Sequence, residues 1–173
     1  MTYSLHQSSV PGFIAVLTNI SNWLDKAAAQ KDEAMLIEAK LAPDMFALAR
    51  QIQVASDGAK GAAARLTGSD APAMADTETS FAELKERCAK TVAYLQGIDP
   101  AAYDAGATRE IVITFPNGAG IRFDGTTFLT QFTIPNFYFH ASMTYAILRA
   151  EGVDLGKQDF LAHLAPFMFP PPA

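Results

Sequence analysis

The chain has 173 residues, of which 50% are hydrophobic and 18% are charged, and its 13 basic and 18 acidic residues give a net charge of −5. This length predicts a single domain over residues 1–173, with a core large enough to need no disulfide or structural metal. Its one cysteine excludes an internal disulfide and a cysteine-rich zinc module. The acidic balance and the lack of a basic stripe exclude nucleic acid as a main partner.

The sequence gives no sign of a membrane or secreted protein. An uninterrupted stretch of about 20 apolar residues, which a membrane span requires, does not occur. The first six residues carry neither a basic region nor a long apolar region, so a secretory signal is not expected. We therefore predict a cytoplasmic protein.

Apolar residues recur at helical spacing in the first part of the chain. The first helix is expected to begin near Ser9 with Pro11 in its first turn, where a missing N–H costs nothing. The second helix is expected to begin at Pro43 and Asp44 and to end at Gly68. A short helical turn over residues 34–37 is expected between them.

The third helix has the clearest boundaries. Ser80 followed by Glu83 forms a capping-box pattern, and Gly97 is expected to end the helix. A loop over residues 69–79 precedes it. Cys88 lies on the apolar stripe of this helix, which predicts a buried, unreactive thiol.

The pattern then changes to one typical of strands. Residues 110–115 are rich in β-branched and aromatic side chains, and polar and apolar side chains alternate over residues 120–124. The pair Asn117-Gly118 between them predicts a two-stranded hairpin. A fourth helix is expected over residues 126–150, with a kink or break at Pro135. This helix is apolar on two nearly opposite faces, so it is expected to be central in the fold or covered by a second chain.

The end of the chain is rich in aromatic and apolar side chains over residues 160–169, followed by three prolines. Because so much apolar area is rarely left in water, we expect this tail to wrap back onto the helices. Together, the elements predict an all-α, antiparallel four-helix bundle with a small β-hairpin between the third and fourth helices.

The fourth helix carries the most notable polar residues. Asn136 and His140 are spaced i, i+4 and face the same way, and Thr144 extends the row. Among aromatic neighbours, His140 is expected to be partly buried, which would keep it neutral and suited to general-base catalysis or metal binding. The alternative is a histidine at the edge of the core, hydrogen-bonded to a carbonyl or to Asn136.

A second polar row lies on the second helix and includes Gln53, Asp57 and Lys60. It can line a pocket together with His140, or it can form a solvated ladder of side chains. Gln51 is expected to point elsewhere.

Several stretches resemble an uncharacterised domain-of-unknown-function family of the DinB/YfiT-like superfamily of metal-dependent enzymes. The resemblance rests on the segments SVPGF (9–13), LAPDMFALARQIQ (41–53), KGAAARLTG (60–68), PNFYFHASMTYAILR (135–149) and GKQDFL (156–161). It implies a four-helix bundle, often dimeric. It also implies a zinc or nickel site with one histidine from the second helix and a His-x3-His pair on the fourth.

This chain departs from that ligand pattern. His140 is the one residue that matches, while Asn136 and Thr144 stand four positions before and after it. The second helix has no histidine, and Gln51 or Gln53 occupies that region. We therefore predict an incomplete metal site with His140 as the remaining ligand, and no cofactor, although zinc or nickel binding is the alternative.

Two functions are compatible with these residues. The first is a homodimeric, non-catalytic bundle, paired through the fourth helix or the hairpin, that binds a small molecule at the degenerate metal position. The alternative is a hydrolase or thiol transferase in which His140 is the base or metal ligand, assisted by Asn136 and Asp57. A third hypothesis is a phenylalanine-lined pocket for a small apolar molecule.

Overall fold

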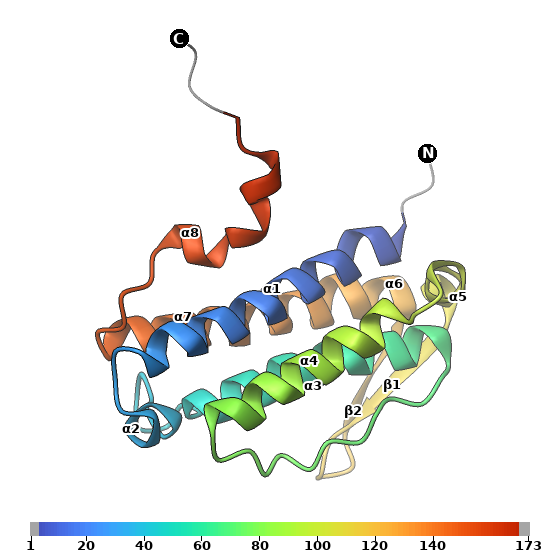
Figure 1. The fold of residues 1–173 in the computed structure, drawn as a ribbon. Coiled ribbons are helices and arrows are strands. Elements are labelled where there is room, and N and C mark those ends of the chain that lie inside the picture. The colour runs from blue at the N-terminus through green and yellow to red at the C-terminus, as the bar shows by residue number, and fades with distance from the viewer. Residues whose placement is uncertain (1–3, 170–173) are drawn as a thin grey trace.

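Four long helices make up the body of the protein, as the computed structural model of residues 4–169 shows (Figure 1). They are α1 (Leu5–Ala28), α3 (Leu48–Thr67), α4 (Phe81–Gln96) and α7 (Ile134–Ala150). The helix α3 packs against both α7 and α4, and α1 packs against α4 and α7. The predicted mostly helical fold is therefore confirmed.

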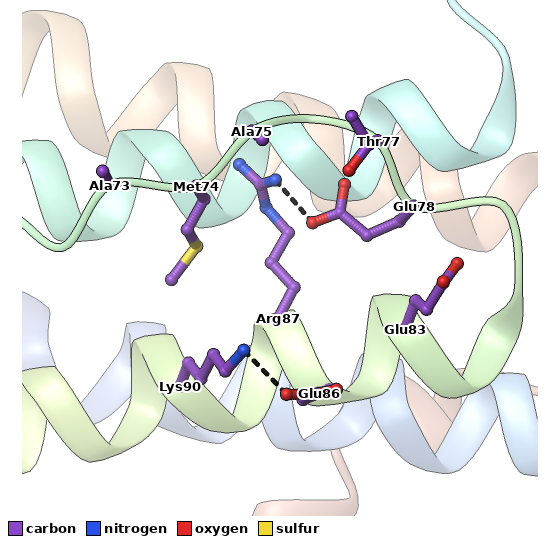
Figure 2. A pocket seen from close by; sticks show the side chains of 9 residues that line it. All are labelled: Ala73, Met74, Ala75, Thr77, Glu78, Glu83, Glu86, Arg87 and Lys90. Atoms are coloured by element: carbon purple, nitrogen blue, oxygen red, sulfur yellow. Dashed lines mark hydrogen bonds and ion pairs between the residues drawn. The ribbon is translucent and has the colours of Figure 1, made fainter.

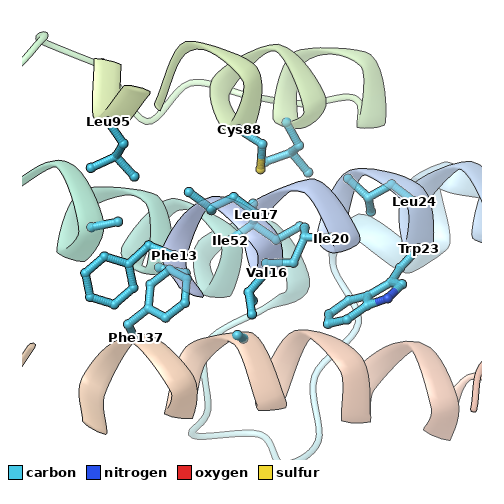
Figure 3. Close-up of a cluster of buried hydrophobic side chains, with 14 of the residues drawn as sticks. Phe13, Val16, Leu17, Ile20, Trp23, Leu24, Ile52, Cys88, Leu95 and Phe137 are labelled. Carbon is cyan, nitrogen blue, oxygen red and sulfur yellow. The ribbon is translucent and has the colours of Figure 1, made fainter. Parts of the chain in front are cut away.

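The core lies between these helices (Figure 3). Leu17, Ile20 and Ile52 are fully buried. Between α1 and α7, the ring centroids of Phe13 and Phe137 lie 4.5 Å apart. Small residues line much of α3, which lets its neighbours come close. Buried members of this set are Ala55, Ala59, Ala62 and Ala63.

The first helix begins earlier than predicted. Ser4 is its N-cap and accepts a hydrogen bond from the Gln7 N–H, so Pro11 lies inside α1 and not in its first turn. The hydroxyl of Ser4 thus caps a helix that was expected to begin near Ser9. Ser9 is instead buried and donates to the Leu5 carbonyl.

The helix α3 begins later than predicted, at Leu48. Residues 43–47 form a loop, because the Leu48 N–H donates to the Ala39 carbonyl and closes the chain behind the short helix α2 (Glu33–Ile37). The end of α3 is as predicted. Gly68 has a φ of +75°, the left-handed conformation that glycine adopts readily.

The capping box at the start of α4 is confirmed, with Ser80 and Glu83 bonding each other's backbone N–H groups. Cys88 on this helix is buried, and burial raises the pKa of its thiol to about 12. A short helix that the sequence analysis missed, α5 (Pro100–Ala105), follows α4. It buries Tyr103, whose hydroxyl lies 3.0 Å from Ser9 Oγ.

The predicted hairpin is present. The strands β1 (Glu110–Thr114) and β2 (Gly120–Asp124) pair antiparallel with Ile113 opposite Ile121. Gly118 has a φ of +83° in the connecting turn, as the Asn-Gly pair predicts.

The fourth long segment is not one regular helix. It consists of α6 (Gly125–Thr127), a π-helical turn (Phe128–Thr133) and then α7. Pro135 lies at the start of α7, and the Ile134 N–H donates to the Leu129 carbonyl, five residues back. In place of the predicted kink or break at Pro135, the chain has a wide turn that ends at Thr133, and Pro135 lies in the first turn of the regular helix that follows.

The chain ends in α8 (Lys157–Phe160) and a 3₁₀ helix (Ala162–Phe167). Phe160 stacks on Trp23 with ring centroids 5.3 Å apart, so the tail returns to the bundle at this point. Phe167, Met168 and Phe169 are 77–85% exposed, so the prediction that the whole tail packs back is wrong. The three prolines at 170–172 lie outside the described residues. Within those residues, no helix combines the length and apolarity needed to cross a membrane.

Candidate functional site

A buried histidine and a buried glutamine meet between α3 and α7. His140 is 6% exposed and Gln51, in the first turn of α3, is 1% exposed. His140 Nδ1 lies 2.7 Å from Gln51 Oε1. The close packing of α3 on α7 brings together two residues that are 89 positions apart in the sequence.

The hydrogen bonds of Gln51 determine which nitrogen of His140 carries the proton. Gln51 Nε2 donates to the Phe46 carbonyl at 3.1 Å, so Gln51 Oε1 is the atom that faces the imidazole. A carbonyl oxygen only accepts, so His140 Nδ1 must be the protonated nitrogen. In the neutral ring, Nε2 is then left as a hydrogen-bond acceptor and base.

The surroundings of His140 keep the ring neutral. Burial, together with the positive charge of Arg50, lowers the pKa of His140 below its ordinary value of 6.5. Phe46 stacks over the imidazole and Phe139 meets it edge-on, with ring centroids at 6.3 Å and 5.1 Å. Both phenylalanines are 51% exposed, so they form a half-open aromatic rim around the histidine.

Other polar groups on α7 and in the turn just before it have unused hydrogen-bonding capacity. Within residues 4–169, Thr133 Oγ1 is the one buried side-chain N or O atom without a partner. His140 Nε2 also makes no hydrogen bond with the described residues. Unlike Thr133 Oγ1 it is not fully buried, so this nitrogen is accessible to solvent. Asn136 is half-buried beside Gly58. Thr144 differs, because its hydroxyl donates to the His140 carbonyl.

The residues at this position do not fit the three-histidine metal site that the resemblance implies. Two donors on one zinc ion lie roughly 3.3 Å apart at ordinary bond lengths. Gln51 Oε1 and His140 Nδ1 are closer than that, at 2.7 Å, and form a hydrogen bond with each other. Across the described part of the chain, no group of three His, Cys, Asp or Glu side chains is arranged to hold a metal ion.

Asp57 belongs to a different cluster, on the side of α3 that faces α4. Its carboxylate pairs with Arg87 at 2.6 Å and with Lys60 at 3.0 Å. Arg87 is 2% exposed and also pairs with Asp76 and Glu78, at 2.7 Å and 2.8 Å. The structure therefore brings Asn136 and His140 onto one face, and it places Asp57 in an ion-pair network apart from them.

This network attaches the loop of residues 69–80 to the helices (Figure 2). Arg87 Nε donates to Ser56 Oγ. Burial lowers the pKa of the guanidinium, but the carboxylates of Glu78, Asp57 and Asp76 outweigh this effect and hold the pKa above its usual value. Asp76 and Glu78 in turn have lowered pKa values despite the opposing effect of burial, because Arg50 and Arg87 bond Asp76, and Arg87 and Gln53 bond Glu78. A polar hollow of about 260 Å³ lies beside Arg87 and Glu78.

The roles of two residues that organise these clusters were not fully predicted. The resemblance put Gln51 or Gln53 in the region of the second-helix metal ligand, but Gln51 was expected to point away from the polar row. Its spacing from Leu48 and Ala55 in fact puts it on the apolar face of its helix. Arg87 follows Leu84 by three positions and precedes Thr91 by four, so the three residues share one face of the helix. This spacing could have indicated that Arg87 is buried.

A model of one protein family matches residues 5–161, which is most of the chain. That family is described as a domain of unknown function, DUF1993. The chain belongs to the DUF1993 family. The resemblance inferred from the sequence is thereby confirmed.

This DUF1993 protein is also similar to a solved structure, the crystal structure of a DinB family member protein from Shewanella denitrificans. The two chains are 39% identical and superpose with a TM-score of 0.84 over 98% of this chain and 95% of the other. No curated protein matches the sequence. The comparisons therefore support a DinB-like fold without assigning an activity.

Proposed function

We propose that this protein is a non-catalytic, DinB-like helical bundle that binds a small molecule at His140 without a metal ion. The observation that carries the proposal is the hydrogen bond between His140 Nδ1 and Gln51 Oε1. Because Gln51 is itself held by the Phe46 carbonyl, the imidazole has one orientation and one tautomer. Its Nε2 is thus a fixed acceptor.

The surroundings suggest the class of ligand. A neutral acceptor recognises an O–H or N–H donor. The rim formed by Phe46 and Phe139 favours a flat apolar body around that donor, since aromatic rings stack well on such groups. The positive charge of Arg50 nearby disfavours a cationic ligand. Phenol-like molecules combine these properties.

The proposal excludes a divalent metal at this position for a physical reason. A metal held by both side chains would need to break the Gln51–His140 hydrogen bond and separate the two donors. His140 Nε2 alone would give one protein ligand, whereas catalytic zinc sites have three.

The test is binding of phenol, with anisole as the matched probe that lacks the donor. We expect ¹⁵N NMR of the histidines to show His140 as the Nδ1–H tautomer and to show a shift of Nε2 on addition of phenol. Anisole should bind at least about tenfold more weakly, which corresponds to roughly one hydrogen bond. The variant His140→Phe should lose the phenol response.

A zinc titration by calorimetry completes the test. We expect no stoichiometric binding of zinc by the purified protein. Stoichiometric zinc that disappears in His140→Phe would contradict the proposal and restore the metal-site reading. An Nε2 resonance unmoved by phenol would contradict the assignment of the ligand class.

A second candidate is an enzyme that uses His140 as a general base. The fixed tautomer favours it, because a base must present its lone pair in a defined direction. In this version Gln51 orients the imidazole, and Asp57 has no part because Arg87 and Lys60 engage it. Hydrolysis of p-nitrophenyl acetate that is lost in His140→Phe, with a pH profile that turns below 6.5, would favour this candidate.

A further inference from the structure

The last described segment, residues 161–169, is an apolar arm that protrudes from the bundle (Figure 1). Its residues include no aspartate, glutamate, lysine or arginine. Leu164 is 42% exposed, and Phe167, Met168 and Phe169 are 78%, 77% and 85% exposed. We refer to residues 161–169 as the C-terminal arm.

The base of the arm is held in place. Trp23 Nε1 donates to the Asp159 carbonyl at 3.1 Å, and Asn19 Nδ2 donates to the Phe160 carbonyl at 2.9 Å. Lys26 pairs with the carboxylate of Asp159 at 2.6 Å. Asn19 Nδ2 also donates to His163 Nδ1 in the arm itself. These contacts fix the direction in which the arm leaves α1, so its apolar tip is presented away from the body of its own chain.

The surface of the same protein offers a matching groove between the start of α1 and the end of α4. Its volume is about 450 Å³, which is large enough for an aromatic side chain. None of its described lining residues is aspartate, glutamate, lysine or arginine. The apolar lining includes Val10, Pro11, Ile14, Ala15, Leu95 and Ile98.

We propose that two copies of this chain form a symmetric dimer in which each C-terminal arm occupies the groove between α1 and α4 of the other copy. The area is sufficient. The exposed side chains of one arm present on the order of 500 Å², given about 150–250 Å² for a buried phenylalanine. Two arms and the two surfaces that receive them then bury roughly 2,000 Å², which reaches the range of stable interfaces.

The distribution of charge also favours the arm of a second copy as the occupant of the groove. Each copy carries a net charge of −5, so two copies repel over most of their surfaces. The arm and the groove are free of acidic and basic side chains, so this contact brings no like charges together. Aromatic anchors in apolar pockets are also the usual source of interface affinity. The hairpin, which together with the fourth helix was expected from the sequence to pair two copies, presents Val112 and Ile121 at 50% and 38% exposure beside the charged pair Arg122–Glu110.

The experiment is light scattering after size exclusion of the full chain at micromolar concentration. The wild type should have twice the 18.6 kDa mass of one chain. The arm variant Phe167→Ser/Met168→Ser/Phe169→Ser and the groove variant Ala15→Glu should both be monomers with wild-type circular dichroism and Tm. The matched hairpin variant Val112→Ser/Ile121→Ser should remain a dimer.

Mixing the two monomeric variants distinguishes exchange of arms from other contacts. The arm variant keeps an intact groove and the groove variant keeps an intact arm, so the mixture can seat one arm. Because one arm buries half of the area, the heterodimer should form at concentrations well above micromolar. A monomeric wild type, a dimeric arm variant or a dimeric groove variant would overturn the proposal. So would a mixture that stays monomeric at every concentration at which the two variants are soluble, while the wild type is a dimer.

Discussion

The two polar clusters on either side of α3 differ in how completely their hydrogen bonds are satisfied. Around Arg87, the carboxylates of Glu78 and Asp57 and the Ser56 hydroxyl accept hydrogen bonds from all three guanidinium nitrogens, and Asp76 adds a third ion pair. Around His140, the one hydrogen bond to Gln51 leaves the other ring nitrogen open. The cluster with more charge is therefore the closed, structural one, and the nearly neutral cluster is the one able to bind something.

The clusters are nevertheless connected. Arg50 pairs with Asp76 of the Arg87 network at 2.5 Å, and its charge also lowers the pKa of His140. Arg50 lies over the ring of Phe46, 5.9 Å from its centroid. A change in the loop of residues 69–80 can thus reach the aromatic rim of the histidine through one side chain.

Of the substitutions that distinguish the two clusters, Arg87→Met is expected to have the largest effect on stability. We expect a loss of about 3 kcal/mol in the free energy of unfolding, because removing one member of a buried ion-pair network leaves the others uncompensated. Urea unfolding followed by circular dichroism measures it. A loss below about 1 kcal/mol would mean that solvent already compensates the three carboxylates.

The open cluster should respond less. His140→Phe leaves the Gln51 carbonyl buried without a donor, which costs about 1–2 kcal/mol. Adding Gln51→Leu removes the orphaned group, so the double variant should recover at least half of that loss. Urea unfolding of both variants gives the coupling, and equal stability of the single and double variants would contradict the hydrogen bond.

The pH dependence of stability should identify His140 as well. Its pKa is lower in the folded protein than in the unfolded chain, so below pH 6.5 the unfolded chain binds a proton that the folded protein does not. Stability is then fully present above pH 6.5 and decreases as the pH falls below it. Urea midpoints at pH 7.5 and 5.5 measure this, and the difference should be smaller in His140→Phe, in which every other titrating group is retained.

The smallest effect is expected on the hairpin. Arg122 pairs with Glu110 at 2.9 Å, but both side chains are more than 60% exposed. Arg122→Met should change the free energy of unfolding by less than about 0.5 kcal/mol. It is the matched control for Arg87→Met, and a comparable loss in the two variants would show that burial is not what distinguishes them.

The sequence was most informative where the cause of structure is local. The capping box of Ser80 and Glu83 and the turn at Asn117-Gly118 depend on neighbouring residues, and both were predicted. His140 and Asn136 were placed on one face for the same reason. The Arg87 network was not predicted, because its carboxylates come from α3 and from a loop with no periodicity. Pairings of that kind depend on how the helices pack.

The π-helical turn before α7 sets the rotational phase of this segment. In a regular helix, Phe128 and His140 would point about 120° apart, since each residue advances by about 100°. One residue absorbed in the wide turn removes most of that angle, and both side chains are buried. Within α7 itself, one of the two apolar faces inferred from the sequence is buried, with Phe137 and Ala141 in the core, while Phe139 on the other face is 51% exposed. The turn therefore keeps Phe128, which follows the hairpin, and His140 on the same side of the segment.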